Sequence, residues 1–212
     1  VGLVLDVVPL FVPESLARAA REPFHPMANA ANAWAFTSPH AVAAYDELRQ
    51  GSWYPVPPFV YAVGEATGAA LRGLGLSPRL PAEPTGRALA QLIGQNAAVQ
   101  RVLHFCGADR RADFRHALSR LGLPLSELIA YQMVPTGASV RWEHGYAGAL
   151  VFSPAGAQSL LQRPGRPSYL PLFAVGDTTA AALLALGAEN VHIAPEPTLA
   201  SLLAHAAAVL AT

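Results

Sequence analysis

Residues 59–75, FVYAVGEATGAALRGLG, and residues 171–187, PLFAVGDTTAAALLALG, are two copies of one pattern. The copies lie 112 residues apart and are identical at nine of 17 positions. Each copy predicts a short apolar strand, a Gly-acid-x-Thr turn and an Ala/Leu-rich helix that ends at a glycine. A helix that begins in such a turn points backbone N–H groups outward at the positive end of its dipole, which favours an anion. We therefore expect two related domains that hold an anionic ligand between them.

Two further pairs of signals repeat at nearly the same spacing. Ser38-Pro39 and Ser153-Pro154 each put a serine at the cap of a predicted helix and a proline at its first position. Pro84-Thr85 and Pro197-Thr198 each put a threonine at the cap of a later helix. Strands alternate with helices along the chain, which predicts an α/β fold with parallel sheets covered on both faces.

Apolar runs and breaker residues predict the other elements. Strands are expected at 3–12, 33–36, 59–63, 77–80, 102–105, 126–134, 149–152 and 191–194. Helices are expected at 14–21, 39–49, 65–74, 85–96, 109–121 and 198–210, and after Ser153 and Gly176. Pro23 and Pro26 are expected to end the first helix, since proline lacks the N–H that a helix interior needs.

The repeat also predicts how the two domains share the chain. One domain is expected to be continuous, from 14 to 133, and the other to combine residues 1–12 with 138–212. The chain then passes twice between them and forms a two-stranded linker. The strand and helix at 102–121 have no counterpart in the other copy, so we expect a strand and a helix of that length to be missing before Val1.

Composition excludes several classes of protein. With 14 basic and 14 acidic residues the chain has no net charge, which argues against nucleic acid as a partner. Cys106 is the one cysteine, which rules out an internal disulfide and fits a reducing compartment. No apolar run reaches the roughly 18 residues of a membrane span, so no membrane partner is expected. No set of side chains has metal-ligand spacing and no glycine-rich nucleotide loop follows a strand, so neither metal nor cofactor is expected.

Several motifs, in this order and at these spacings, resemble the uroporphyrinogen-III synthase family over nearly the whole chain. The motifs are Phe36-Thr37-Ser38-Pro39, Ala62-Val63-Gly64-Glu65-x-Thr67, Gly107-x-Asp109-x-Arg111, Tyr131, Phe152-Ser153-Pro154-x-Gly156 and Val175-Gly176-x-Thr178-Thr179. The resemblance implies two flavodoxin-like parallel-sheet domains, related by duplication and joined by a two-stranded linker. One departure is the start, where family members usually have a strand that ends in an Arg-Pro turn.

The resemblance also implies an activity. Family members are cofactor-independent lyases of heme biosynthesis that take hydroxymethylbilane, expel water, invert the last pyrrole ring and close the macrocycle. This chain is accordingly expected to be a cytoplasmic, monomeric enzyme whose partner is that small molecule. The alternative is a non-catalytic, two-lobed protein that binds a tetrapyrrole or another small anion.

The substrate that the resemblance implies carries carboxylates on every ring, so its site needs many hydrogen-bond donors. The candidate substrate-binding residues are Thr37, Ser38, Gly64, Thr67, Arg110, Arg111, Ser153, Gly156, Gly176, Thr178 and Thr179. For Ser38, Ser153 and Thr179 the alternative is plain helix capping. Arg110 and Arg111 are expected to open a helix, where their positive charge opposes the helix dipole, and such a placement can mark a site for an anionic ligand. The alternative is that both are solvated surface arginines without a ligand.

Tyr131 is the candidate catalytic residue. The resemblance implies that its hydroxyl assists departure of the substrate hydroxyl by hydrogen bonding or proton donation. The alternative is a half-buried aromatic ring that packs between the domains. His104 and Cys106 lie two apart on one predicted strand face, and a buried, inert thiol is the simpler interpretation of Cys106.

Overall fold

The computed structural model describes residues 3–50 and 55–211 and has an α/β fold made of two compact units. Unit 1 consists of Val1–Val12 and Pro135–Thr212, and unit 2 of Pro13–Val134. The chain passes between them in strands β1 (Phe11–Ser15) and β5 (Leu125–Pro135). Leu16 N donates to Ala130 O at one end of this ribbon and Thr136 N donates to Leu10 O at the other, which is antiparallel pairing.

The sheet of unit 2 has the strand order β1-β5-β4-β2-β3. Strands β2 (Ala33–Phe36), β3 (Phe59–Ala62), β4 (Val102–Gly107) and β5 run parallel to one another. The register places His104 of β4 opposite Glu127 of β5. The strand predicted at 77–80 is reduced to one bridge between Tyr61 and Arg79. Pro78 and Pro81 flank that bridge, and since neither has an N–H the ladder ends there.

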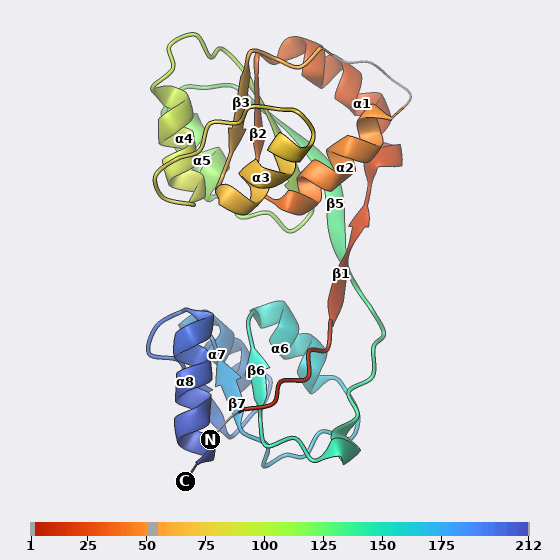
Figure 1. Cartoon of the computed structure of the whole chain (residues 1–212), viewed down its shortest axis with the longest axis vertical. Helices are drawn as coiled ribbons and strands as arrows, with labels where there is room; N and C mark the ends of the chain where they lie inside the picture. Colours follow the sequence, from red (N-terminus) through yellow and green to blue (C-terminus); the bar gives the residue numbers. More distant parts are fainter. Residues whose placement is uncertain (1–2, 51–54, 212) are drawn as a thin grey trace. The chain divides into compact units, whose positions relative to one another are not determined.

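Helices cover both faces of this sheet, as Figure 1 shows. One face carries α1 (Ala17–Ala30), α2 (Pro39–Arg49) and α3 (Glu65–Gly73), and the other carries α4 (Gly86–Gly94) and α5 (Asp113–Arg120). Side chains alternate along β2, so Trp34 and Phe36 are buried under α1 to α3, while Ala33 and Ala35 are buried under α4 and α5. Both faces of the central strands are therefore core.

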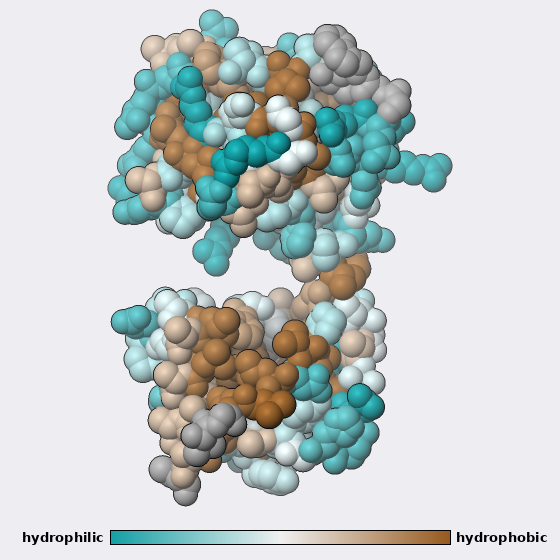
Figure 2. Space-filling model, in the orientation of Figure 1, coloured by the Kyte–Doolittle hydropathy of each residue, from teal (hydrophilic) through white to brown (hydrophobic). Residues whose placement is uncertain are grey.

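Unit 1 has a smaller parallel sheet of β6 (Ala149–Val151), β7 (Leu172–Ala174) and β8 (Val191–Ile193). Helices α6 (Pro154–Leu161) and α7 (Asp177–Ala185) pack on one face and α8 (Leu199–Leu210) on the other. A short 3-10 turn, Trp142–His144, precedes β6. Within the described residues β6 pairs with β7 alone. Figure 2 shows apolar side chains gathered on the face of unit 1 over β6 and β7.

Two predicted elements differ from the structure near the start of the chain. Helix α1 runs through Pro23 and Pro26 to Ala30, because the buried ring of Phe24 anchors it, 5.8 Å from the rings of both Trp34 and Phe105. The strand expected from residue 3 begins only at Phe11. Val4 and Val7 before it are exposed and have no ladder partner among the described strands.

No helix in the described part of the chain combines the length and the apolar character that crossing a membrane requires.

Truncation of Phe24 should measure how strongly the aromatic core holds the proline-containing helix. Phe24→Ala is expected to lower the free energy of unfolding by about 3–5 kcal/mol, because it leaves a cavity among Trp34, Tyr45 and Phe105. Urea unfolding followed by tryptophan fluorescence measures this loss. Phe152→Ala removes the same ring from a position that is 54% exposed and should cost less than about 1 kcal/mol. Equal losses for the two variants would contradict this role of Phe24.

Candidate functional site

A hollow of about 400 Å³ lies at the carboxyl ends of the parallel strands of unit 2. Thr37 follows β2, Val63 follows β3, Gly107 ends β4 and Tyr131 lies on β5. The rest of its lining comes from the start of α4, the segment before α5 with the first residue of that helix, and two buried side chains: Pro84, Thr85, Gly86, Asp109, Arg110, Arg111, Asp113, His104 and Phe114. The carboxyl edge of a parallel sheet is where α/β proteins usually bind ligands, which makes this hollow the candidate site.

The structure brings four of the predicted residues together in this hollow: Thr37, Arg110, Arg111 and Tyr131. Ser38, Gly64 and Thr67 lie at the starts of α2 and α3, just beyond the residues that line it. The other five belong to unit 1, at the starts of α6 and α7: Ser153, Gly156, Gly176, Thr178 and Thr179. The side chains of Thr67 and Thr179 are buried in the cores of their own units.

The two predicted serine caps are formed. Ser38 Oγ accepts a hydrogen bond from His40 N at 3.1 Å, and Ser153 Oγ accepts one from Gly156 N at 3.0 Å. Each hydroxyl is therefore engaged by its own helix, which favours the capping alternative for these side chains.

Glycines begin the other two repeated helices. Gly64 and Gly176 occupy the cap positions of α3 and α7 and offer no side-chain acceptor to the first turn. The first residue of each helix is acidic, Glu65 or Asp177, and its charge is favourable at the positive end of the dipole. Both helix starts thus combine backbone donors with a carboxylate.

The prediction that Arg110 and Arg111 open a helix is wrong, because α5 begins only at Asp113. Arg110 instead folds back onto the sheet. Its Nε and Nη2 donate to the two carboxylate oxygens of Glu127 at 3.0 and 3.1 Å, and its Nη1 donates to Ala108 O at 3.1 Å. These bonds hold the preceding segment as a turn. Among the described residues, the exposed side chain of Arg111 has no hydrogen-bond or ion-pair partner, so it is the arginine left for a ligand.

Glu127 is the main residue that sequence reasoning missed. Besides Arg110, its carboxylate has Arg115 Nη1 at 3.6 Å and His104 Nδ1 at 3.6 Å, and its side chain is only 15% exposed. The neighbouring His104 ring and the hydrogen bonds from Arg110 lower the pKa of Glu127 to about 2. A signal was present in the sequence, since Glu127 is the one charged residue in the strand predicted at 126–134.

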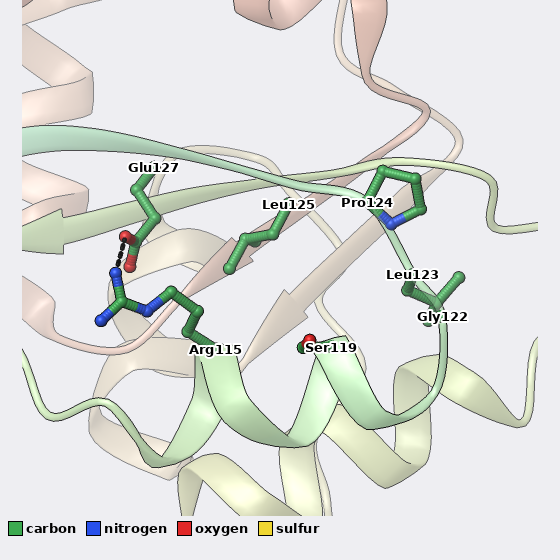
Figure 3. A pocket seen from close by; sticks show the side chains of 7 residues that line it. All are labelled: Arg115, Ser119, Gly122, Leu123, Pro124, Leu125 and Glu127. Carbon is green, nitrogen blue, oxygen red and sulfur yellow. Dashed lines mark ion pairs between the residues drawn. The ribbon is translucent and has the colours of Figure 1, made fainter.

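Glu127 also borders a second hollow of about 520 Å³ (Figure 3). Arg115 reaches from α5 to the Glu127 carboxylate, and Leu125 projects from β5 into the space between the strand and the helix. The remaining lining is Ser119, Gly122, Leu123 and Pro124. The lining of this second hollow includes none of the predicted site residues.

His104 connects Glu127 with the candidate site. Its Nε2 lies 2.9 Å from Thr37 Oγ1, at hydrogen-bond distance, while its Nδ1 is buried, faces Glu127 and has no hydrogen-bond partner among the described residues. The ring packs edge-on against Phe114, with the ring centres 4.7 Å apart, and the side chain is 2% exposed. Burial lowers the pKa of His104 below its usual 6.5, so the imidazole is neutral at pH 7.

Tyr131 lies across the end of β4. A Cβ atom at Gly107 would come within 2.7 Å of Tyr131 Cζ and 2.9 Å of its hydroxyl oxygen, so only glycine leaves room for the phenol there. The ring also packs edge-on against His40, with the ring centres 5.5 Å apart. Its place in the lining exposes it to a ligand, while these contacts hold its orientation.

His104, Cys106 and Glu127 could offer ligand atoms to a metal ion, because these atoms lie within 4.8 Å of one another. The Cys106 thiol is buried, as predicted, and donates to Leu128 O. Burial raises its pKa to about 12, which opposes the thiolate that a metal needs. A cation would also have to displace Arg110 from Glu127. This group is therefore better described as a hydrogen-bonding network, and a metal-free site stays a prediction.

Comparisons with known proteins agree over nearly the whole chain. The family model of uroporphyrinogen-III synthase HemD matches residues 4–204. No significant match was found among curated proteins.

Solved structures show where else this fold occurs. The chain is similar to a uroporphyrinogen-III synthetase from Helicobacter pylori, with a TM-score of 0.70 and 17% identity over 97% of this chain and 95% of that one. A mutant uroporphyrinogen III synthase from Thermus thermophilus gives a TM-score of 0.62 and 19% identity over 96% and 88%. Another structure of the Thermus thermophilus synthase gives 0.52 and 18% over 95% and 86%. At these identities the structural likeness shows the fold alone.

The low pKa of Glu127 predicts how stability depends on pH. Its value in the folded protein, about 2, lies below the ordinary 4.5, so the carboxylate stabilises the fold above about pH 5. That contribution, roughly 3 kcal/mol at 1.4 kcal/mol per pH unit, is lost as the pH falls from about 5 to about 2. Urea unfolding at stepped pH should show Glu127→Gln well below wild type at pH 7 and close to it near pH 2.

The matched control is Glu83→Gln, which removes the same charge from an exposed position. Its stability should stay parallel to wild type across this pH range. A constant gap between wild type and Glu127→Gln from pH 7 to pH 2 would refute the assignment.

Proposed function

The chain belongs to the uroporphyrinogen-III synthase family, and we propose that it is a lyase that dehydrates and cyclises hydroxymethylbilane to uroporphyrinogen III in heme biosynthesis. The reaction expels the hydroxyl of the substrate, inverts the last pyrrole ring and closes the macrocycle. The observation that carries the proposal is the hollow at the carboxyl ends of β2 to β5, where Arg111 has no partner among the described residues and Tyr131 lies over Gly107.

Binding in this hollow is proposed to rest on Arg111 and on backbone donors. The guanidinium of Arg111 suits a ring carboxylate of the substrate. Arg110 contributes indirectly, because its hydrogen bonds to Glu127 and Ala108 hold the segment from which Arg111 projects. The carboxylates of Asp109 and Asp113 also line the hollow, so a substrate carboxylate is expected on the side of Arg111.

The helix starts are proposed to supply the remaining contacts. In unit 2 these are the first turns of α2 and α3, with Ser38, Gly64 and Thr67. In unit 1 they are the first turns of α6 and α7, with Ser153, Gly156, Gly176, Thr178 and Thr179. Backbone N–H groups bind carboxylates without reacting with them, which suits a ligand whose last ring must turn. Of the three threonines here, only Thr178 has an exposed side chain, so Thr67 and Thr179 would act through their backbone.

Tyr131 is proposed to assist departure of the substrate hydroxyl. Its phenol can donate a hydrogen bond to the leaving oxygen, and Gly107 and His40 hold the ring at the edge of the hollow. The pyrrole nitrogen itself expels the hydroxyl, so most of the rate should come from holding the reacting groups in place. Neither a metal nor an organic cofactor has a role in this proposal.

We further infer that the two units arose by duplication and have flavodoxin-like topology. Strands β2 to β5 of unit 2 have the order β3-β2-β4-β5, which is 2-1-3-4 in chain order. Thr85 and Thr198 cap α4 and α8 in the same way, each by accepting a hydrogen bond from the backbone N–H three residues on. The domains would be 14–133 and 1–12 with 138–212, in a monomeric, cytoplasmic enzyme.

The isomer formed from hydroxymethylbilane tests the proposed function. The protein is expected to yield type III uroporphyrinogen, whereas spontaneous closure gives type I, and oxidation followed by chromatography separates the isomers. Type I alone would contradict the synthase and favour the non-catalytic binding protein.

Two substitutions test Tyr131. Tyr131→Phe removes the hydroxyl and is expected to lower kcat for the type III isomer by roughly 10-fold, the range expected of one hydrogen bond that strengthens in the transition state. Gly107→Ala keeps the hydroxyl and displaces the ring, so it should lower kcat at least as much. Rates close to wild type for both variants would remove Tyr131 from the mechanism. Ala108→Ser, next to Gly107 in the same turn, is the control for a small added group.

A further inference from the structure

Three polar side chains form a row from the first hollow to the second hollow across one face of the sheet of unit 2. Thr37 follows β2, His104 lies on the neighbouring strand β4, and Glu127 lies opposite His104 on β5. Thr37 Oγ1 and His104 Nε2 are 2.9 Å apart, and His104 Nδ1 and Glu127 Oε1 are 3.6 Å apart. Of these three residues, Thr37 and His104 line the hollow at the carboxyl ends of the strands, and Glu127 does not.

The surroundings of the imidazole decide which nitrogen carries its proton. A neutral imidazole has one N–H and one lone pair. Nδ1 faces a carboxylate that Arg110 and Arg115 keep ionised, and a lone pair pointing at that negative charge would be repelled. The proton therefore belongs on Nδ1, and the lone pair on Nε2 is left to accept the hydroxyl proton of Thr37.

We propose that His104 and Glu127 are positioning residues that make Thr37 Oγ1 an obligatory hydrogen-bond acceptor for a pyrrole N–H of the substrate. A hydroxyl has one proton, and because Thr37 donates it to His104 only lone pairs remain towards the hollow. This inference rests on the proposed function, since hydroxymethylbilane carries a pyrrole N–H on each ring. The carboxylates in the lining are Asp109, in the segment between β4 and α5, and Asp113, the first residue of α5, and neither lies at the end of β2.

A hydrogen-bond acceptor at Thr37 Oγ1 would speed the reaction as well as bind the substrate. As the pyrrole nitrogen expels the hydroxyl, positive charge develops on the ring and its N–H becomes a stronger donor. The hydrogen bond to Thr37 is then stronger in the transition state than in the bound substrate, which is the condition for raising kcat.

Protonation of His104 should reverse the arrangement. The charged groups around the ring are Glu127 on β5, Arg110 in the turn after β4, and Asp113 and Arg115 on α5, with the Cys106 thiol on the same strand. In imidazolium both nitrogens donate, so Nε2–H would turn the Thr37 proton towards the hollow and repel the substrate N–H. Activity should therefore fall on the acid side, below the usual histidine pKa of 6.5.

The tautomer can be observed without any activity. In protein labelled with ¹⁵N-histidine at pH 7.5, long-range ¹H–¹⁵N correlation spectra separate the two neutral tautomers, and the signals that vanish in His104→Gln identify His104 among the seven histidines. We expect a neutral ring with Nδ1 protonated. A ring protonated on Nε2, or a charged ring, would overturn the proposal.

Kinetics of type III formation give the second readout. Thr37→Val keeps the shape and removes the hydroxyl, and is expected to lower kcat roughly 10- to 100-fold with a smaller change in KM. Thr37→Ser restores the acceptor and should recover most of the loss. His104→Gln offers Thr37 an amide oxygen that does not titrate near neutral pH, so the acid limb of the kcat profile should disappear. An unchanged kcat in Thr37→Val, or an unchanged acid limb of the kcat profile in His104→Gln, would contradict the proposed roles of Thr37 and His104.

The unfolding midpoints of all three variants show whether a loss of activity comes from misfolding or from loss of the hydrogen-bond acceptor. If His104→Gln does not fold, the comparison of Thr37→Val with Thr37→Ser tests the proposal. The outcomes also separate this inference from the function on which it rests. If wild type forms no type III isomer, the proposed function fails, while the tautomer still shows how Thr37 is held. If wild type is active and His104 is the Nε2–H tautomer, the proposed synthase activity is supported and the proposed acceptor role of Thr37 is refuted.

Discussion

The half-buried carboxylate of Glu127 is the constraint on which the site of unit 2 depends. A charge on a strand inside a packed sheet is costly unless donors surround it, and this one has Arg110 on both oxygens, with Arg115 and His104 beside it. Meeting that demand engages the guanidinium of Arg110, although Arg110 lines the hollow, and keeps the segment before α5 from becoming helical. By the tautomer argument above, it also determines which nitrogen of His104 carries the proton. One buried charge thus determines which groups a ligand can meet.

In the proposed site, donors bind the substrate carboxylates and Thr37 binds a pyrrole N–H. Arg111 and the helix starts would present the N–H groups, and Thr37 would present a lone pair. Tyr131 lines the same hollow, over Gly107. In the proposed reaction the substrate expels its own leaving group. The enzyme then needs to hold the substrate in its reactive conformation more than it needs a strong acid or base, because the main cost is the entropy of arranging one flexible molecule.

Local signals predicted most of the fold and part of this site. The repeated pattern and the Ser-Pro and Pro-Thr starts correspond to β3-α3, β7-α7 and the caps of α2, α4, α6 and α8, because helix caps depend on residues within three positions of each other. The failures depend on distant contacts. Helix α1 continues through its prolines because Phe24 meets Trp34 and Phe105, and α5 starts late because Arg110 meets Glu127 across the sheet. The row from Thr37 to Glu127 required the register of three strands, which no pattern along the chain specifies.

The two repeated Ser-Pro turns distinguish residues that a helix start requires from residues that the candidate site requires. Ser38 and Ser153 each cap a helix just after a strand. Ser38 accepts from the backbone N–H two residues on, and Ser153 accepts from the one three residues on. The residue just before the cap differs, being Thr37 in unit 2 and Phe152 in unit 1, where the ring is exposed. A helix start therefore does not require a hydroxyl at that place. The hydroxyl of Thr37 lies at hydrogen-bond distance from His104 at the hollow, and this difference between the two turns supports the proposal that Thr37 is a functional residue.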